Sequence, residues 1–126
     1  MENARIVFCD FDGTITVEDT FAGAIAPLVP EAAERILPAL FARQMTLRQG
    51  VRELLGAVPS DRYADILAYA AKQPIRAGFA DLLAWLEARQ VPLVVVSGGI
   101  EGMVRAVLDR PGRDGRPLSD RVTAIS

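Results

Sequence analysis

The sequence contains no histidine, a single cysteine, Cys9, and a single lysine, Lys72, among its 126 residues. The absence of histidine excludes metal sites and catalytic triads that depend on imidazole. One cysteine cannot form an intrachain disulfide, and Cys9 lies in an apolar run, so we expect a buried, inert thiol. This cysteine usage favours a reducing cytoplasm.

Neither sign of charge is in large excess, because the sequence has 14 basic and 16 acidic residues and a net charge of −2. This balance predicts no nucleic acid partner and no binding to an anionic membrane. No apolar run approaches the length of a membrane span, and the N-terminus does not resemble a secretion signal. We therefore expect a cytoplasmic protein with a small-molecule partner.

Three short apolar runs are rich in strand-forming residues: 5–9, 92–96 and 121–125. Continuous apolar character is typical of parallel strands buried on both faces, which is our expectation for the first two runs. The third run is weaker. Half of the residues are hydrophobic, 51%, which is enough for one packed domain.

Helices are predicted where apolar residues recur at helical spacing. These segments are 21–28, 36–41, 47–58, 63–70, 79–86 and 100–108. Thr46 and Ser60 precede two of them as candidate caps, and Pro38 is expected to kink another.

The order strand, helices, strand, helix, strand predicts an α/β fold with a Rossmann-like parallel sheet and right-handed crossovers. The first crossover is far longer than one helix requires. We therefore predict that residues 18–72 form an inserted helical cap, and that residues 1–17 and 73–126 form the α/β core.

Polar residues follow the first two predicted strands at the points where each ends. Asp10-Phe11-Asp12-Gly13-Thr14 follows the first, and Ser97-Gly98-Gly99 follows the second. In open α/β sheets, ligands bind beyond the carboxyl ends of the strands. One aspartate can attack phosphorus while the other transfers a proton, and a hard cation such as Mg²⁺ can sit between them. The serine hydroxyl and backbone N–H groups suit an anion.

Each cluster has an ordinary explanation when taken alone. Asp-x-Asp-Gly occurs in turns and in calcium loops, and Ser-Gly-Gly is a weaker signal still. Their joint position at two successive parallel strand ends favours a phosphate site.

The segments 6–15 and 94–99 resemble the first and second motifs of the haloacid dehalogenase superfamily. The predicted cap is similar to that of its phosphoserine-phosphatase-like branch. The resemblance implies a Mg²⁺-dependent phosphomonoester hydrolase that acts on a small phosphorylated metabolite. It implies that Asp10 is the nucleophile and Asp12 the general acid/base, and that both hold the metal, Asp12 through its backbone carbonyl. It also implies that Thr14 and Ser97 hold phosphate oxygens, with Gly98 contributing its backbone.

Two residues bear on the substrate. Segments 47–51 and 75–79 resemble the methionine-salvage phosphatases of this branch, and Asp19 and the region of Gly50 favour that family. Arg52 lies where phosphoserine phosphatases use an arginine for the substrate carboxylate, so it favours phosphoserine. A solvated helix face is the other interpretation of Arg52.

The family also uses a later lysine and a later pair of carboxylates. Lys72 precedes the second motif, and Asp114 and Asp120 follow no predicted strand, so none of them matches. We therefore expect the N-terminal part of an enzyme or a shortened relative, with little turnover alone. The sheet would end after its third strand and leave 6–8 on an open apolar edge, through which copies of the chain could associate. A phosphate-binding or interaction module and a partial reading frame are the alternatives.

Overall fold

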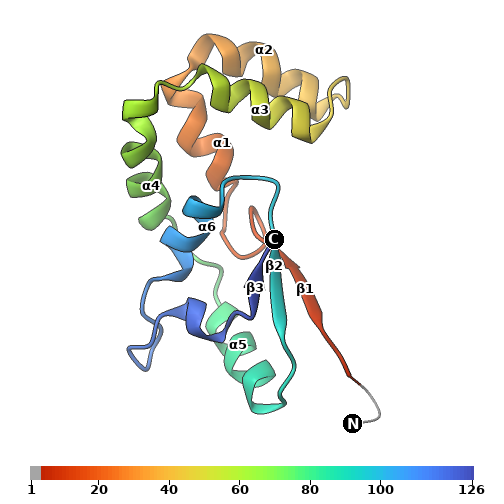
Figure 1. Ribbon diagram of the computed structural model, residues 1–126, viewed down its shortest axis with the longest axis vertical. Helices are drawn as coiled ribbons and strands as arrows, with labels where there is room; N and C mark the ends of the chain where they lie inside the picture. Colours follow the sequence, from red (N-terminus) through yellow and green to blue (C-terminus); the bar gives the residue numbers. More distant parts are fainter. Residues whose placement is uncertain (1–3) are drawn as a thin grey trace.

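A computed structural model describes residues 4–126; residues 1–3 of the predicted core lie outside the described residues. The sheet contains three parallel strands in the order β1-β2-β3, which confirms the predicted class (Figure 1). They are β1 (Val7–Asp10), β2 (Leu93–Val96) and β3 (Ala124–Ile125). The first predicted strand is displaced toward the C-terminus, so that Asp10 is its last residue and lies beside Val96.

Six α-helices and three short 3₁₀ turns make up the rest of the described elements. The helices are α1 (Thr20–Ile25), α2 (Pro30–Phe41), α3 (Leu47–Ala57), α4 (Tyr63–Ala71), α5 (Phe79–Ala88) and α6 (Glu101–Leu108). The 3₁₀ turns are η1 (Ala26–Leu28), η2 (Ser60–Arg62) and η3 (Leu118–Arg121).

The predicted helix starts had mixed outcomes. Thr46 caps α3, since its hydroxyl oxygen accepts a hydrogen bond from the N–H of Gln49 at 3.1 Å. The prediction for Ser60 is wrong, because Ser60 opens a 3₁₀ turn and α4 begins after Arg62 without a side-chain cap. Helix α2 continues through Pro38 to Phe41.

Only one face of the sheet is covered by described residues. Both crossovers move the chain in the same direction across the sheet, so right-handed connections place α5 and α6 on the same face. Leu93 and Val95 are buried on that side. Ile6 and Phe8 are 50% and 67% exposed. Val96 of β2 is 43% exposed on the same open face. Burial on both faces is therefore wrong for β1 and β2, whereas the open apolar edge at β1 is confirmed among the described residues.

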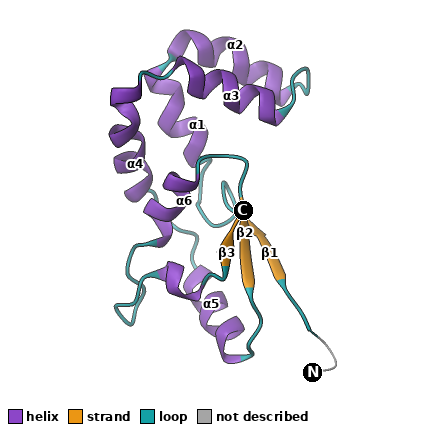
Figure 2. Ribbon diagram, in the orientation of Figure 1, coloured by secondary structure: helices purple, strands orange, loops and turns teal. Residues whose placement is uncertain are grey.

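Helices α1 to α4 stand beyond the carboxyl ends of the strands (Figure 2). Helix α2 packs on α3, and α4 packs on α1 and α6. The two segments that connect these helices to the sheet are bridged, since the N–H of Val17 donates to the carbonyl of Pro74 at 3.2 Å. The helices occupy the predicted cap, although its boundaries stay a prediction. None of the helices within residues 4–126 has the length and apolar character that crossing a bilayer requires.

Candidate active site

The loop after β1 is folded tightly around one carbonyl group. The carbonyl oxygen of Phe11 accepts hydrogen bonds from the N–H groups of residues 14, 15 and 16 at 3.1, 2.9 and 3.2 Å. The Phe11 side chain is buried and anchors the loop in the core. Gly13 has φ of 72°, in the left-handed region where glycine is favoured. The chain can therefore reverse immediately after β1 and leave its carboxylates at the strand end.

The two carboxylates of this loop lie in different environments. Asp10 is exposed, and its Oδ2 accepts a hydrogen bond from the Thr14 hydroxyl at 3.2 Å. Asp12 is half-buried, and its Oδ1 accepts the N–H of Thr20 at 3.0 Å. Burial raises the pKa of Asp12, and the negative charges of Asp19 and Asp10 add to this shift, while backbone N–H groups at the start of α1 oppose it. A carboxyl group that retains its proton more readily suits a general acid.

The loop after β2 lies next to the first loop, because Asp10 and Val96 are neighbours in the register. Ser97 is half-buried, and its hydroxyl oxygen accepts the N–H of Gly99 at 3.1 Å. Ser97 and Asp12 line the same small cavity. The structure thus brings the two predicted phosphate loops together.

The two predicted substrate-binding residues have different surroundings in the structure. The Asp19 carboxylate caps α1 by accepting the N–H of Ala22 at 2.9 Å. Arg52 is exposed and lines a groove shared with Gly98, and Asp19 is not among the residues that line that groove. Asp19 therefore has a structural explanation, and Arg52 lies beside the second loop.

The Asp10 carboxylate and the backbone carbonyl of Asp12 supply oxygen ligands that fit a magnesium ion. The two aspartates are close enough for the charge of Asp10 to contribute to the raised pKa of Asp12. Mg²⁺ in such sites uses one or two carboxylates and completes its octahedron with water and substrate phosphate oxygens. Within residues 4–126, no group of three or more His, Cys, Asp or Glu side chains could hold a metal ion.

Arg76 is a residue at this site that the sequence did not reveal. Its guanidinium donates hydrogen bonds to the carbonyl oxygens of Gly13 at 2.9 Å, Thr14 at 3.1 Å and Val17 at 3.5 Å. Its backbone N–H donates to the carbonyl of Ile15 at 2.7 Å. Arg76 therefore holds the loop after β1 from a point about 60 residues away along the chain. Only the tertiary structure shows this role, since no spacing signal links the two segments.

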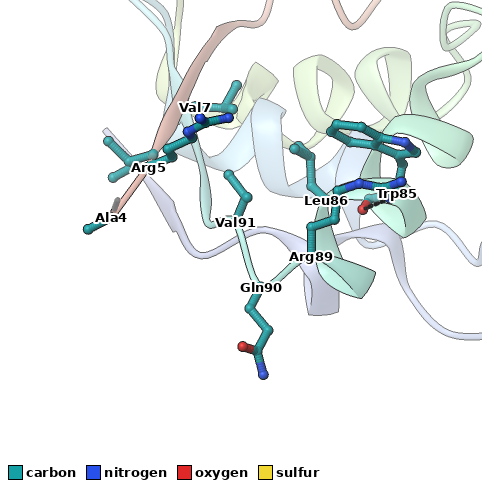
Figure 3. A pocket seen from close by; sticks show the side chains of 9 residues that line it. Ala4, Arg5, Val7, Trp85, Leu86, Arg89, Gln90 and Val91 are labelled. Atoms are coloured by element: carbon teal, nitrogen blue, oxygen red, sulfur yellow. Dashed lines mark hydrogen bonds between the residues drawn. The ribbon is translucent and has the colours of Figure 1, made fainter. Parts of the chain in front are cut away.

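A second hollow lies at the opposite end of the sheet (Figure 3). Its lining includes Arg5, just before β1, and Val7, the first residue of β1, together with Trp85 of α5 and Arg89, which follows that helix. The Arg89 guanidinium stacks on the Trp85 ring, 3.8 Å from its centroid. Because it lies at the amino ends of the strands, this hollow is remote from Asp10 and takes no part in the site.

Comparison with known proteins agrees with this geometry. The chain is 52% identical to a protein of Microcystis aeruginosa named 2-hydroxy-3-keto-5-methylthiopentenyl-1-phosphate phosphatase, over 97% of this chain and 56% of that protein. The chain thus spans about half the length of this relative.

The solved structures show the same fold at low sequence identity. A phospho-aspartyl intermediate analogue of phosphoserine phosphatase has a TM-score of 0.69 at 14% identity, and the match covers 98% of this chain and 56% of that one. A phosphoserine phosphohydrolase-like protein from Francisella tularensis has a TM-score of 0.63 at 15% identity, over 91% and 63% of the two chains. The model of the haloacid dehalogenase-like hydrolase family matches residues 7–124, and the chain belongs to that family.

Proposed function

We propose that this chain carries the nucleophile, the general acid/base and the first phosphate contacts of a Mg²⁺-dependent phosphomonoester hydrolase. Asp10 is the nucleophile and Asp12 the general acid/base. Thr14, Ser97 and Gly98 hold phosphate oxygens. The observation that carries the proposal is the pairing of an exposed Asp10 with a half-buried Asp12 whose pKa is raised.

The reaction would proceed in two displacements. An oxygen of Asp10 attacks phosphorus, the ester P–O bond breaks, and the leaving oxygen takes the proton of Asp12. Water then attacks the phosphorus of the aspartyl phosphate, gives a proton to Asp12 and releases inorganic phosphate and free Asp10. Mg²⁺ held by Asp10 and Asp12 would neutralise negative charge on the phosphoryl group.

The test uses trapping of the nucleophile as well as turnover. Beryllium trifluoride binds an aspartate nucleophile in place of a phosphoryl group and is followed by ¹⁹F NMR. We expect a Mg²⁺-dependent bound signal in the unmodified chain and in Asp12→Asn, and none in Asp10→Asn. Hydrolysis of an aryl phosphate is measured in parallel for all three proteins. A bound signal or hydrolysis that is unchanged in Asp10→Asn would rule out Asp10 as nucleophile.

For the substrate we propose 2-hydroxy-3-keto-5-methylthiopentenyl-1-phosphate. The proposal is supported by the name of the Microcystis relative, which is 52% identical over 97% of this chain. Phosphoserine is the second candidate, favoured by the position of Arg52 in the groove beside Gly98. Release of phosphate from the two compounds distinguishes these candidates. A phosphate-binding module without catalysis is the third, and it predicts beryllium trifluoride binding without turnover.

We further propose a cytoplasmic location, supported by the single, free Cys9. Association between copies of the chain is proposed through the open edge of β1. The exposed side chains of Ile6 and Phe8 at this edge support it, since such edges favour pairing with another strand.

A further inference from the structure

A groove of about 720 Å³ separates helix α3 from the loop that follows β2. Its lining consists of Leu47, Arg48, Val51, Arg52, Leu55 and Gly98. All but one of these residues belong to α3, and the remaining one is a predicted phosphate contact. The groove therefore joins the helical cap to the site.

The apolar residues of α3 that line this groove are not the ones that pack against α2. Gly50 and Leu54 are buried, and Gly50 faces Leu40 of α2. The groove is lined by the adjacent stripe of Leu47, Val51 and Leu55, which recur every four residues and so share one helix face. Leu47 is 61% exposed, although α3 carries polar residues elsewhere. An exposed aliphatic stripe beside a candidate active site suits an apolar ligand group.

The stripe reaches the phosphate loop itself. A Cβ placed on Gly98 would lie 2.9 Å from Cδ2 of Leu47, closer than real Cβ contacts allow without movement. Gly98 follows Ser97, which shares its small cavity with Asp12. A ligand whose phosphate is held at Ser97 and Gly98 would therefore have the groove beside it, and the rest of the molecule could extend along the aliphatic face of α3.

The charges that line the groove favour some polar groups of a ligand over others. Arg48 and Arg52 are its charged lining residues, and no acidic residue lines it. A substrate ammonium would lie between aliphatic side chains and two cations, without a partner to offset its lost hydration. Keto, enol or hydroxyl oxygens would meet guanidinium donors, and an uncharged hydrocarbon or thioether would meet the leucines.

We propose that Leu47, Val51 and Leu55 form a subsite for the uncharged, apolar tail of the phosphomonoester. This inference rests on the proposed function. The substrate proposed above has that chemistry, because its phosphate is on carbon 1 and its methylthio group is on carbon 5. The apolar end and the phosphate are then at opposite ends of the molecule.

The test compares the affinities of methyl phosphate and pentyl phosphate in the presence of Mg²⁺, by amide chemical-shift titration. Each fully buried CH₂ is worth about fourfold in affinity. We expect pentyl phosphate to bind more than about tenfold tighter than methyl phosphate, since four CH₂ groups are added and the groove is partly open.

Leu47→Asn removes part of the stripe at an exposed position, and Val51→Asn is a second variant that removes its centre. Both are expected to reduce the preference for pentyl phosphate to less than about threefold while methyl phosphate binds as before. Leu82→Asn on α5 is the matched control, since Leu82 is 39% exposed and outside the groove. The control is expected to retain the full preference.

The outcomes distinguish failure of the apolar subsite from failure of the proposed function. Binding of methyl phosphate without a chain-length preference would overturn the apolar subsite and leave the proposed function intact. A preference that persists in both Leu47→Asn and Val51→Asn would also overturn it. Failure of both phosphates to bind would remove the proposed function and the subsite with it.

Discussion

The close approach of α2 and α3 gives a prediction whose sign depends on tertiary contacts alone. Gly50 and Gly56 both lie in α3, so replacing either with alanine makes the same chemical change in the same helix. A Cβ on Gly50 would lie 2.5, 2.7 and 2.8 Å from three side-chain carbons of Leu40 in α2, whereas one on Gly56 would meet nothing within 4 Å. Only the Gly50 substitution must displace the Leu40 side chain.

The magnitudes follow from two opposing effects. Alanine in place of glycine stabilises a helix interior by about 0.5–1 kcal/mol. Overpacking a well-packed contact costs about 1–3 kcal/mol, although Leu40 is half-buried and can relax in part. We expect Gly50→Ala to lower the free energy of unfolding by about 1 kcal/mol and Gly56→Ala to raise it by about 0.5–1 kcal/mol. For a chain of this size, the difference in unfolding free energy between the two variants corresponds to roughly 8 °C in Tm.

Thermal and urea denaturation followed by circular dichroism measure both variants against the unmodified chain. Equal increases in Tm for Gly50→Ala and Gly56→Ala would refute the close contact between α2 and α3. The result also bears on the groove, since this contact sets the position of the α3 face that lines it. A control at Gly98 is unsuitable, because Gly98 belongs to the candidate site.

Three further predictions concern the site and the sheet edge. The pKa of Asp12 is raised above its ordinary value of 3.8, so the contribution of its protonated form to stability is complete below that value and is lost as the pH rises through the folded-state pKa. In metal-free buffer, Asp12→Asn should therefore increase the urea midpoint at pH 7 more than at pH 3. An equal gain at both pH values would contradict the shift. Arg76→Met should lower the free energy of unfolding by about 1–2 kcal/mol and weaken beryllium trifluoride binding, because the hydrogen bonds of Arg76 to the loop after β1 are lost. Arg76→Lys should be intermediate. Unchanged values in both assays would show that the arginine is dispensable. Phe8→Lys should shift sedimentation velocity profiles toward the monomer, and a concentration-independent monomer before the substitution would rule out association through β1.

The local sequence determined much of the architecture and the chemistry. Continuous apolar runs predicted the strands, although β1 starts later than expected, and helical spacing predicted the helices that follow. The loop after β1 was also readable, because Asp10, Asp12 and Gly13 are adjacent in the chain and their strand-end position follows from the parallel topology. Thr46 was recognisable as a cap, since capping involves residues three apart.

Features that join distant segments were decided only by the tertiary structure. The burial of β1 depends on what packs against it: apolar sequence predicts two covered faces, yet Phe8 is 67% exposed because both helices after the cap lie on the same side. Arg76 contacts the loop after β1 through carbonyl groups, which leave no trace in side-chain pattern. The groove arises because Leu47 of the cap meets Gly98 of the core. Sequence periodicity identifies an apolar stripe, but only folding determines whether that stripe meets another helix or borders a space that a ligand can fill.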